Sequence, residues 1–206
     1  MTARIAPAIA PFSEEVQGWL DRTMPAGVAP LMLFTTLARD ERLFKKIFAG
    51  GLIDRGHLTL RQREIVIDRT TALCDCEYEW GVHVSFFAKR VGLTEAHLHS
   101  LVHGEAEDPC WNGGERLLIR MCDELHGTCS LSDQLWTELR AEYSAEAILE
   151  LLMLAGYYRT ISYLANALTL PLEAFGARFP TDRDRSSPDE HPAGGRGASG
   201  ICGRIP

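Results

Sequence analysis

The sequence predicts an all-α protein, a packed bundle of about seven to nine helices. Three observations support this class. Apolar residues recur three and four positions apart, between helix-capping residues, along most of the chain. The alternation of apolar and polar residues between hairpin turns, which is typical of strands, is absent. The hydrophobic fraction of the 206 residues, 46%, is sufficient for the core of one domain.

Three short helices are expected at the start of the chain. Ser13 is typical of an N-cap, and a short amphipathic helix follows it. Pro30 fits the first turn of a second helix. Asp40 would cap a third helix, which Gly50 and Gly51 end.

The next two helices carry the clearest signals. Thr59 and Gln62 have the spacing of a capping box. The helix that they open is apolar nearly all round at Ile65–Ile67, so it should be buried. A further helix is expected over residues 76–91, with Gly92 at its C′ position.

Capping residues also mark the remaining helices. Thr94 would cap a short helix, and Asn112 and Glu115 have the spacing of another capping box. Ser132 and Ser144 would cap the last two long helices.

The composition divides the chain into three parts. The last helix, at roughly residues 145–168, is the most apolar one. We expect one helical domain over residues 12–179, after an N-terminal extension of residues 1–11. Residues 180–206 hold little apolar surface, so a disordered tail is expected there, and Cys202 has no predicted role in it.

Charge and composition exclude several classes of protein. A net charge of −7 argues against nucleic acid as a partner, because phosphate binding needs clustered Lys and Arg. No apolar run reaches the about 20 residues of a membrane span, and the N-terminus lacks the apolar segment of a signal peptide. We therefore expect a cytoplasmic protein whose six cysteines are free thiols.

Four candidate functional residues lie on one face of the predicted helix over 76–91. Cys76, Glu79, Trp80 and His83 are spaced i, i+3, i+4 and i+7, which places them within an arc of about 100°. That face would carry a candidate nucleophile, a candidate acid or base, an aromatic wall and an imidazole. Glu64 lies on the preceding predicted helix and adds a second carboxylate.

The same residues follow a known motif, a Glu, eleven residues, and then Cys-x-x-Cys-x-x-x-His. Alignment on His83 places Glu64 on the motif Glu, Cys76 on the first Cys, and Glu79 where the second Cys belongs. The sequence thereby resembles the carboxymuconolactone decarboxylase and AhpD-like (alkylhydroperoxidase D-like) family over roughly residues 12–175. Two further stretches, Gly92–Thr94 and Gly156–Glu173, share this resemblance.

The resemblance implies two kinds of chemistry. AhpD-like peroxidases use one thiol to attack peroxide and a second to resolve it as a disulfide. Glu79 removes that pair here, and Cys74 points about 200° away from Cys76 on a helix, although a strained bridge between them stays open. The decarboxylase branch implies acid/base work on a small carboxylated lactone or related ring, with Glu64, Glu79 and His83 as catalytic groups. A position near a helix N-terminus would lower the pKa of Cys76.

Three functions follow as hypotheses. The first is a carboxymuconolactone decarboxylase-like enzyme using cofactor-free acid/base chemistry. The second is an AhpD-like peroxidase that uses Cys76 alone with an external thiol. The third is a non-catalytic binding module with the same fold. The resemblance implies a small-molecule substrate, no cofactor, no metal, and a homo-oligomer that is a dimer or a trimer-based assembly.

Each site residue also has a purely structural interpretation. Glu64 could pair with Arg61 or Arg69 at the surface, Cys76 could be an inert apolar residue, and Trp80 is expected in the core. Glu64, Cys76, Glu79 and His83 are also metal-ligand types, but spacing alone is weak support for a metal site. Other residues with two open interpretations are the helix-face histidines His97, His99 and His103, and the interface or pocket residues Tyr157, Tyr158 and Asn166.

Overall fold

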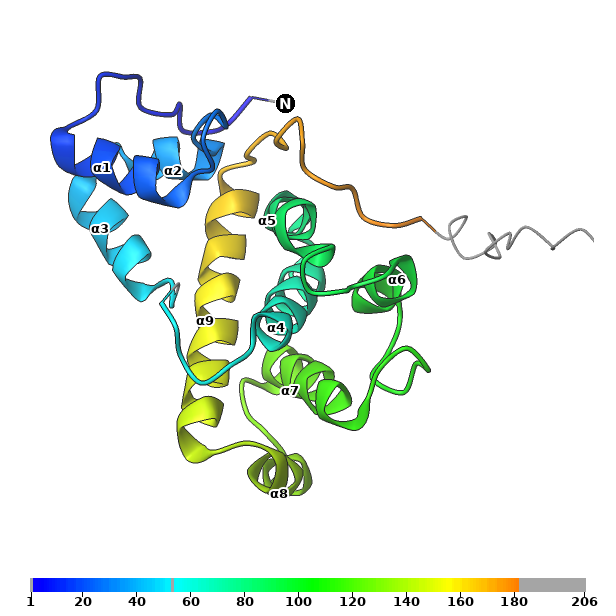
Figure 1. The fold of residues 1–206 in the computed structure, drawn as a ribbon. Helices are drawn as coiled ribbons and strands as arrows, with labels where there is room; N and C mark the ends of the chain where they lie inside the picture. The colour runs from blue at the N-terminus through cyan, green and yellow to red at the C-terminus, as the bar shows by residue number, and fades with distance from the viewer. Residues whose placement is uncertain (1, 53, 182–206) are drawn as a thin grey trace, which may run out of the picture.

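The computed structural model describes residues 2–52 and 54–181, and within these ranges the chain forms nine α-helices, one π-helical segment and no strand (Figure 1). The predicted all-α class is confirmed. The elements are α1 (Glu14–Thr23), α2 (Met32–Leu37), α3 (Glu41–Gly50), α4 (Leu60–Leu73), α5 (Glu77–His83), η1 (Val84–Ala88), α6 (Glu95–His103), α7 (Gly113–Thr128), α8 (Asp133–Glu142) and α9 (Ala145–Ala167). The predicted tail beyond residue 181, with Cys202, lies outside the described residues.

The predicted caps begin the helices as expected. Side chains of Ser13, Asp40, Ser132 and Ser144 accept a backbone N–H three residues on, and both capping boxes form. Pro30 is an exception, because α2 begins only at Met32 and Pro30 lies before its N-cap. A tertiary contact satisfies this helix start, since the Met32 N–H donates to Glu173 Oε1 at 2.6 Å.

The predicted helix over residues 76–91 is separate from the preceding helix, as expected, but it is not regular along its length. Asp75 adopts a left-handed conformation (φ 51°), so α4 and α5 are separate and Cys76 is the N-cap of α5. Beyond His83 the helix widens into η1, and Gly92 (φ 69°) ends the turn that follows. Cys76 therefore does not share a regular helical face with Glu79, Trp80 and His83.

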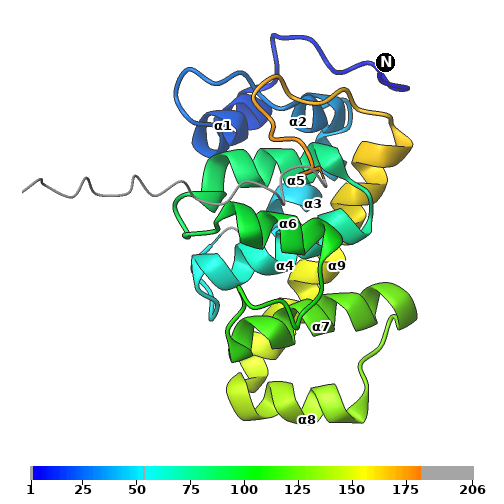
Figure 2. The same cartoon turned by 90° about the vertical axis from the view of Figure 1, so that its right-hand side faces the viewer.

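Helix α4 is the centre of the bundle. It contacts α5, α6, α7 and α9, and its residues from Glu64 to Thr71 are all buried, as its apolar sequence predicted. Helices α6 and α8 lie on the outside of this group (Figure 2). The side of α9 away from α4 faces the N-terminal helices α1–α3 (Figure 1).

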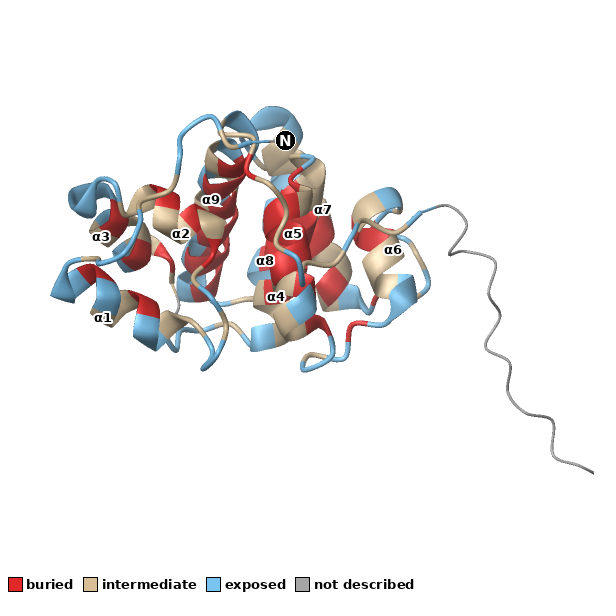
Figure 3. Ribbon diagram, turned by 90° about the horizontal axis from the view of Figure 1, so that it is seen from above, coloured by how far each residue is buried: buried red, intermediate tan, exposed pale blue. Residues whose placement is uncertain are grey.

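Helices α1–α3 form a cap with a small core of its own. Val16, Leu20, Phe44 and Phe48 make this core, separate from the main one (Figure 3). Polar contacts join the cap to the bundle: the Tyr157 hydroxyl donates to the Ile47 carbonyl at 3.1 Å, and the Leu33 N–H donates to the Tyr78 hydroxyl at 3.0 Å. The fold thus places two cores side by side.

The segment after α9 returns across α5. The Ala177 N–H donates to the Gly81 carbonyl at 3.0 Å, and the Ser85 hydroxyl donates to the Phe175 carbonyl at 2.9 Å. None of the described helices is both long and apolar enough to cross a membrane.

Gly81 allows this close approach, so its replacement by alanine is expected to be destabilising. A Cβ at Gly81 would lie 2.3 Å from the Ala177 carbonyl oxygen, which requires the backbone to move. We expect Gly81→Ala to lower the free energy of unfolding by about 1–3 kcal/mol in urea denaturation. Gly127→Ala is the control, since nothing lies within 4 Å of a Cβ there. Equal stability of the two variants would contradict this account of the α5 contact.

Candidate active site

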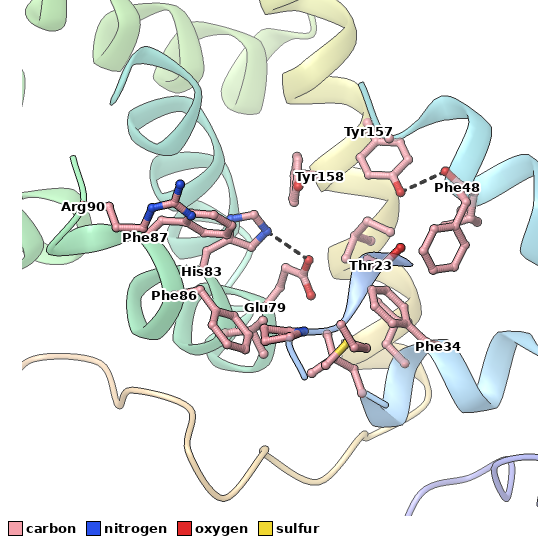
Figure 4. A pocket seen from close by; sticks show the side chains of 18 residues that line it. Thr23, Phe34, Phe48, Glu79, His83, Phe86, Phe87, Arg90, Tyr157 and Tyr158 are labelled. Carbon is pink, nitrogen blue, oxygen red and sulfur yellow. Dashed lines mark hydrogen bonds and ion pairs between the residues drawn. The ribbon is translucent and has the colours of Figure 1, made fainter. Parts of the chain in front are cut away.

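A cavity of about 320 Å³ lies between the α1–α3 cap and the bundle (Figure 4). Residues of the cap, of α5 and η1, and of α9 line it. Its walls are mainly apolar, and its charged lining residues are Glu79, His83 and Arg90. The aromatic lining residues are Phe34, Phe48, Phe86, Phe87, Tyr157 and Tyr158. A mainly apolar cavity with a few converging polar groups is typical of small-molecule sites.

His83 lies between two carboxylates. Its Nδ1 is 2.9 Å from Glu64 Oε2, and its Nε2 is 3.5 Å from Glu79 Oε1. Glu64 projects from α4, whereas Glu79 precedes His83 by one turn of α5. The ring of Tyr158 from α9 and the imidazole form a T-shaped pair, with centroids 5.0 Å apart.

The structure therefore brings Glu64, Glu79 and His83 together. The alternative that Glu64 pairs with Arg61 or Arg69 is wrong. Arg61 Nε pairs with Glu115 and Arg69 Nε with Asp123, at 2.5 and 2.7 Å.

The carboxylates decide the protonation of His83. Burial alone would lower the pKa of His83, because it penalises the imidazolium. The charge of Glu64 and its hydrogen bond outweigh this and, with Glu79, raise the pKa of His83 to about 10. His83 is thus an imidazolium at neutral pH, and its Nδ1–H donates to Glu64.

Glu79 has one oxygen without a partner. Oε2 is buried and has no hydrogen-bond partner among the described residues, while Oε1 faces His83. Glu79 lines the cavity, and its side chain points to the space beside His83 (Figure 4). Glu79 is therefore a cavity-lining carboxylate with one buried oxygen that no described residue satisfies.

Sequence reasoning missed Asp68, which lies one turn after Glu64 on α4. The residue is 1% exposed, and both carboxylate oxygens are without partners within the described part of the chain. Burial and then the charge of Glu64 raise the pKa of Asp68 well above its ordinary value. The signal was present as an acidic i, i+4 pair in an apolar helix.

Cys76 and Trp80 do not line the cavity, which corrects their predicted site roles. Cys76 is fully buried at the start of α5, and burial raises its pKa to about 11 rather than lowering it. Desolvation of the thiolate therefore raises the pKa of Cys76 by more than the helix N-terminus lowers it. Trp80 is 1% exposed and packs on Phe179, with ring centroids 5.1 Å apart, so it is a core residue as the alternative interpretation held.

The structure also locates the other candidate residues, the two neighbouring cysteines and three residues of α9. Cys74 and Cys76 are free thiols, so the strained bridge between them is not formed. Asn166 lies outside the cavity and donates to the Cys74 carbonyl at 2.8 Å. Tyr157 and Tyr158 line the cavity.

A metal held by the predicted residues is not supported by their geometry. Both nitrogens of His83 face carboxylates, and Cys76 lies away from the cavity. No cluster of three or more potential ligands is found in the described residues. His97 contacts Arg61 at 3.1 Å, whereas the rings of His99 and His103 are 5.1 Å apart.

Residues 42–116 match the model of the carboxymuconolactone decarboxylase family. This segment contains Glu64, Cys76 and His83, which match the motif, and Glu79, which replaces its second Cys. The family resemblance is confirmed. No protein of curated function matches the sequence.

Solved structures show the AhpD-like fold. A peroxidase-related protein from Silicibacter sp. TM1040 is 14% identical, with a TM-score of 0.73 over 85% of this chain and 94% of that one. An alkylhydroperoxidase AhpD core protein from Ralstonia eutropha JMP134 is also 14% identical, with a TM-score of 0.72 over 82% and 93%. A cysteine-to-alanine variant of the debrominase Bmp8, in complex with 2,3,4-tribromopyrrole, is 17% identical, with a TM-score of 0.66 over 85% and 94%.

Proposed function

We propose that the chain is a carboxymuconolactone decarboxylase-like enzyme that transfers protons on a small ring compound without a bound cofactor. The observation that carries the proposal is the position of His83 between Glu64 and Glu79, with His83 and Glu79 lining the cavity. Charges fixed in an apolar site act strongly on a reacting group, because little water screens them.

In the proposed reaction, Glu79 is the proton acceptor. Its carboxylate takes a proton from a C–H or O–H group of the ring, and the electron pair of the broken bond moves to a ring carbonyl oxygen. The Nε2–H of His83 stabilises the resulting oxyanion. Return of the proton to another ring atom completes an isomerisation. Loss of CO2 from a carboxylated ring produces the same kind of oxyanion, which then takes a proton at carbon from the Nε2–H of His83.

Glu64 has a positioning role in this proposal. By accepting from Nδ1–H, it holds the imidazole so that Nε2 faces Glu79 and the cavity. The ring-binding debrominase neighbour adds support for a substrate of ring size, although its identity to this chain is low.

The peroxidase alternative has less support. Peroxide attack needs an accessible thiolate. Cys76 is buried, lies outside the cavity and has a pKa of about 11. The binding-module alternative requires the same cavity and differs only in the absence of turnover.

Two further proposals concern the protein as a whole. A homo-oligomer is supported by exposed apolar residues on α9, where Leu149, Met153 and Tyr163 are 64%, 60% and 59% exposed. We also keep the expectation of a cytoplasmic protein, which rests on the sequence.

Solvent exchange tests the proposed reaction without knowledge of the natural substrate. Ring ketones and lactones are incubated with the protein in D2O, and deuterium at carbon is followed by NMR. We expect exchange with the wild-type protein and equally with Cys76→Ser. Absence of exchange on every compound, together with peroxide turnover that needs Cys76, would replace this proposal with the peroxidase.

Cys76 itself is expected to resist oxidation. After peroxide treatment at neutral pH, mass spectrometry should find Cys76 as a thiol, because its thiolate is disfavoured by burial. The exposed Cys129 provides the internal comparison. Stoichiometric sulfenic acid at Cys76, reversed by a small thiol, would show that the thiol is reactive after all.

A further inference from the structure

Among the three charged residues that line the cavity, Arg90 alone has no ionic partner in the described part of the chain. His83 lies between Glu64 and Glu79, so the other two charged lining residues face each other. The contact found for the Arg90 guanidinium, within residues 2–52 and 54–181, is with the ring of Phe87, whose centroid lies 5.5 Å from Cζ. A guanidinium carries five N–H donors in a planar fork, so Arg90 is available to bind an anionic group.

One row of side chains joins Arg90 to the proposed reacting groups. The lining residues from α5 to Arg90 are spaced three and four positions apart, as on one helix face: Glu79, Val82, His83, Phe86, Phe87 and Arg90. The row begins with a carboxylate and ends with a guanidinium just beyond η1. The two ends of this cavity wall therefore carry opposite charges.

The Arg90 side chain turns back along this row toward His83. Side chains of a helix lean toward its N-terminus, and the Arg90 Cζ accordingly lies near the ring of Phe87, three residues earlier. The ring centroids of Phe87 and His83 are also 5.5 Å apart. The guanidinium carbon and the imidazole centroid are thus separated by no more than twice this distance (Figure 4). One ring with a charged substituent spans such a gap.

The cavity has room for one substituted ring. Its volume is about 320 Å³, roughly twice the ~150 Å³ of an apolar cavity that accommodates benzene. The six aromatic side chains named above line it, and aromatic walls favour the faces and edges of a ring. A single ring with a carboxyl group therefore fits both the space and the walls.

The charges of the row give such a ring a direction. Arg90 is exposed and Glu79 is buried, so Arg90 lies on the solvent side of the cavity. A carboxylate would be attracted by Arg90 and repelled by Glu79. It would also keep part of its hydration beside the exposed guanidinium, which lowers the cost of binding. The rest of the ring would then point toward His83 and Glu79.

We propose that Arg90 is a specificity-determining residue that binds the carboxylate of a single-ring acid and orients the ring toward His83 and Glu79. This inference rests on the proposed function, for which it names the residue that selects the substrate. A guanidinium pairs with a carboxylate through two parallel hydrogen bonds, which fixes direction as well as position. The bound carboxylate itself is unchanged, and proton transfer takes place at ring atoms nearer to Glu79.

Benzoate and benzamide form the matched pair of probes, because they share one shape and differ in charge. Their dissociation constants for the full chain are measured by NMR titration of the labelled protein at pH 7 and low salt. We expect benzoate to bind about 3- to 10-fold more tightly, the effect of a partly exposed bidentate pair. The preference should shrink at high salt, and benzoate should shift the resonances of His83 and Phe87, which places it in the cavity.

Variants of two neighbouring residues separate Arg90 from the general charge of this region. In Arg90→Gln the preference for benzoate should disappear, and in Arg90→Lys part of it should remain, since lysine keeps the charge without the planar fork. Lys89→Gln is the control, because it removes the same charge from an exposed residue that does not line the cavity. Its preference should equal that of the wild type.

Three results would overturn the inference. They are equal binding of the two probes to the wild type, a preference that persists in Arg90→Gln, and failure of both probes to bind at millimolar concentration. Deuterium exchange that continues in such a case would leave the proposed function intact with another mode of substrate binding. Benzoate binding that depends on Arg90, without exchange on any compound, would support the role of Arg90 while the proposed function fails.

Discussion

Replacement of Glu79 by glutamine is expected to slow proton transfer by about 10²- to 10⁴-fold, the usual contribution of a general base. Glutamine has nearly the same shape and keeps an oxygen that can face His83, but it cannot take a proton at neutral pH. Glu79 is the carboxylate that lines the cavity, whereas Glu64 lies behind His83 and is not among the lining residues. The rate of deuterium exchange on the best compound of the panel measures the effect.

Glu77→Gln is the matched control for this variant. Glu77 lies two residues earlier on α5, and its Oε1 accepts from the Phe179 N–H at 3.0 Å, a contact that an amide oxygen can keep. Its exchange rate should equal that of the wild type. If Glu79→Gln kept the wild-type rate as well, another group would have to be the base.

The second large effect concerns stability. At neutral pH the imidazolium of His83 compensates the buried carboxylates of Glu64 and Glu79, so His83→Gln leaves them unpaired. Removal of one partner from a buried ion pair costs about 3–5 kcal/mol. We expect a loss of this size in the free energy of unfolding, measured in urea at pH 7.

The pH dependence of this loss has a definite sign. The folded-state pKa of His83, about 10, lies above its ordinary 6.5. The stabilisation by the imidazolium is therefore fully present below pH 6.5 and is lost as the pH rises through about 10. The difference in free energy of unfolding between the wild type and His83→Gln should shrink between pH 8 and pH 11. Because both proteins share the other titrating groups, their contributions cancel in this difference. A difference that stays constant over this range would show that His83 is not the titrating group.

The helices were predictable because their starts are encoded locally. Ser13, Asp40 and the capping box at Thr59 act through backbone groups three residues away, so spacing alone identifies them. The start of α2 was predicted too early, because its first N–H is satisfied by Glu173, far along the chain. The widening into a π-helical segment after His83 was missed, since it leaves little trace in apolar periodicity.

The candidate site was only partly predictable. The spacing of Glu64 and His83 in a known motif led to the pair that meets in the structure. Trp80 was placed wrongly because one residue rotates a helix by about 100°, which turns it from the cavity side to the core. Phe34 and Phe48 could not be assigned to the cavity from sequence, because only the tertiary packing of α1–α3 brings them to it.

The most direct test of the account is the protonation state of His83 at pH 8. In a protein with ¹⁵N-labelled histidine, the resonances of His83 are assigned among the seven histidines by comparison with His83→Gln. We expect an imidazolium with both ring nitrogens protonated, which titrates near pH 10 and at a lower pH in Glu64→Gln. A neutral His83 ring at pH 8 in the wild-type protein would contradict it.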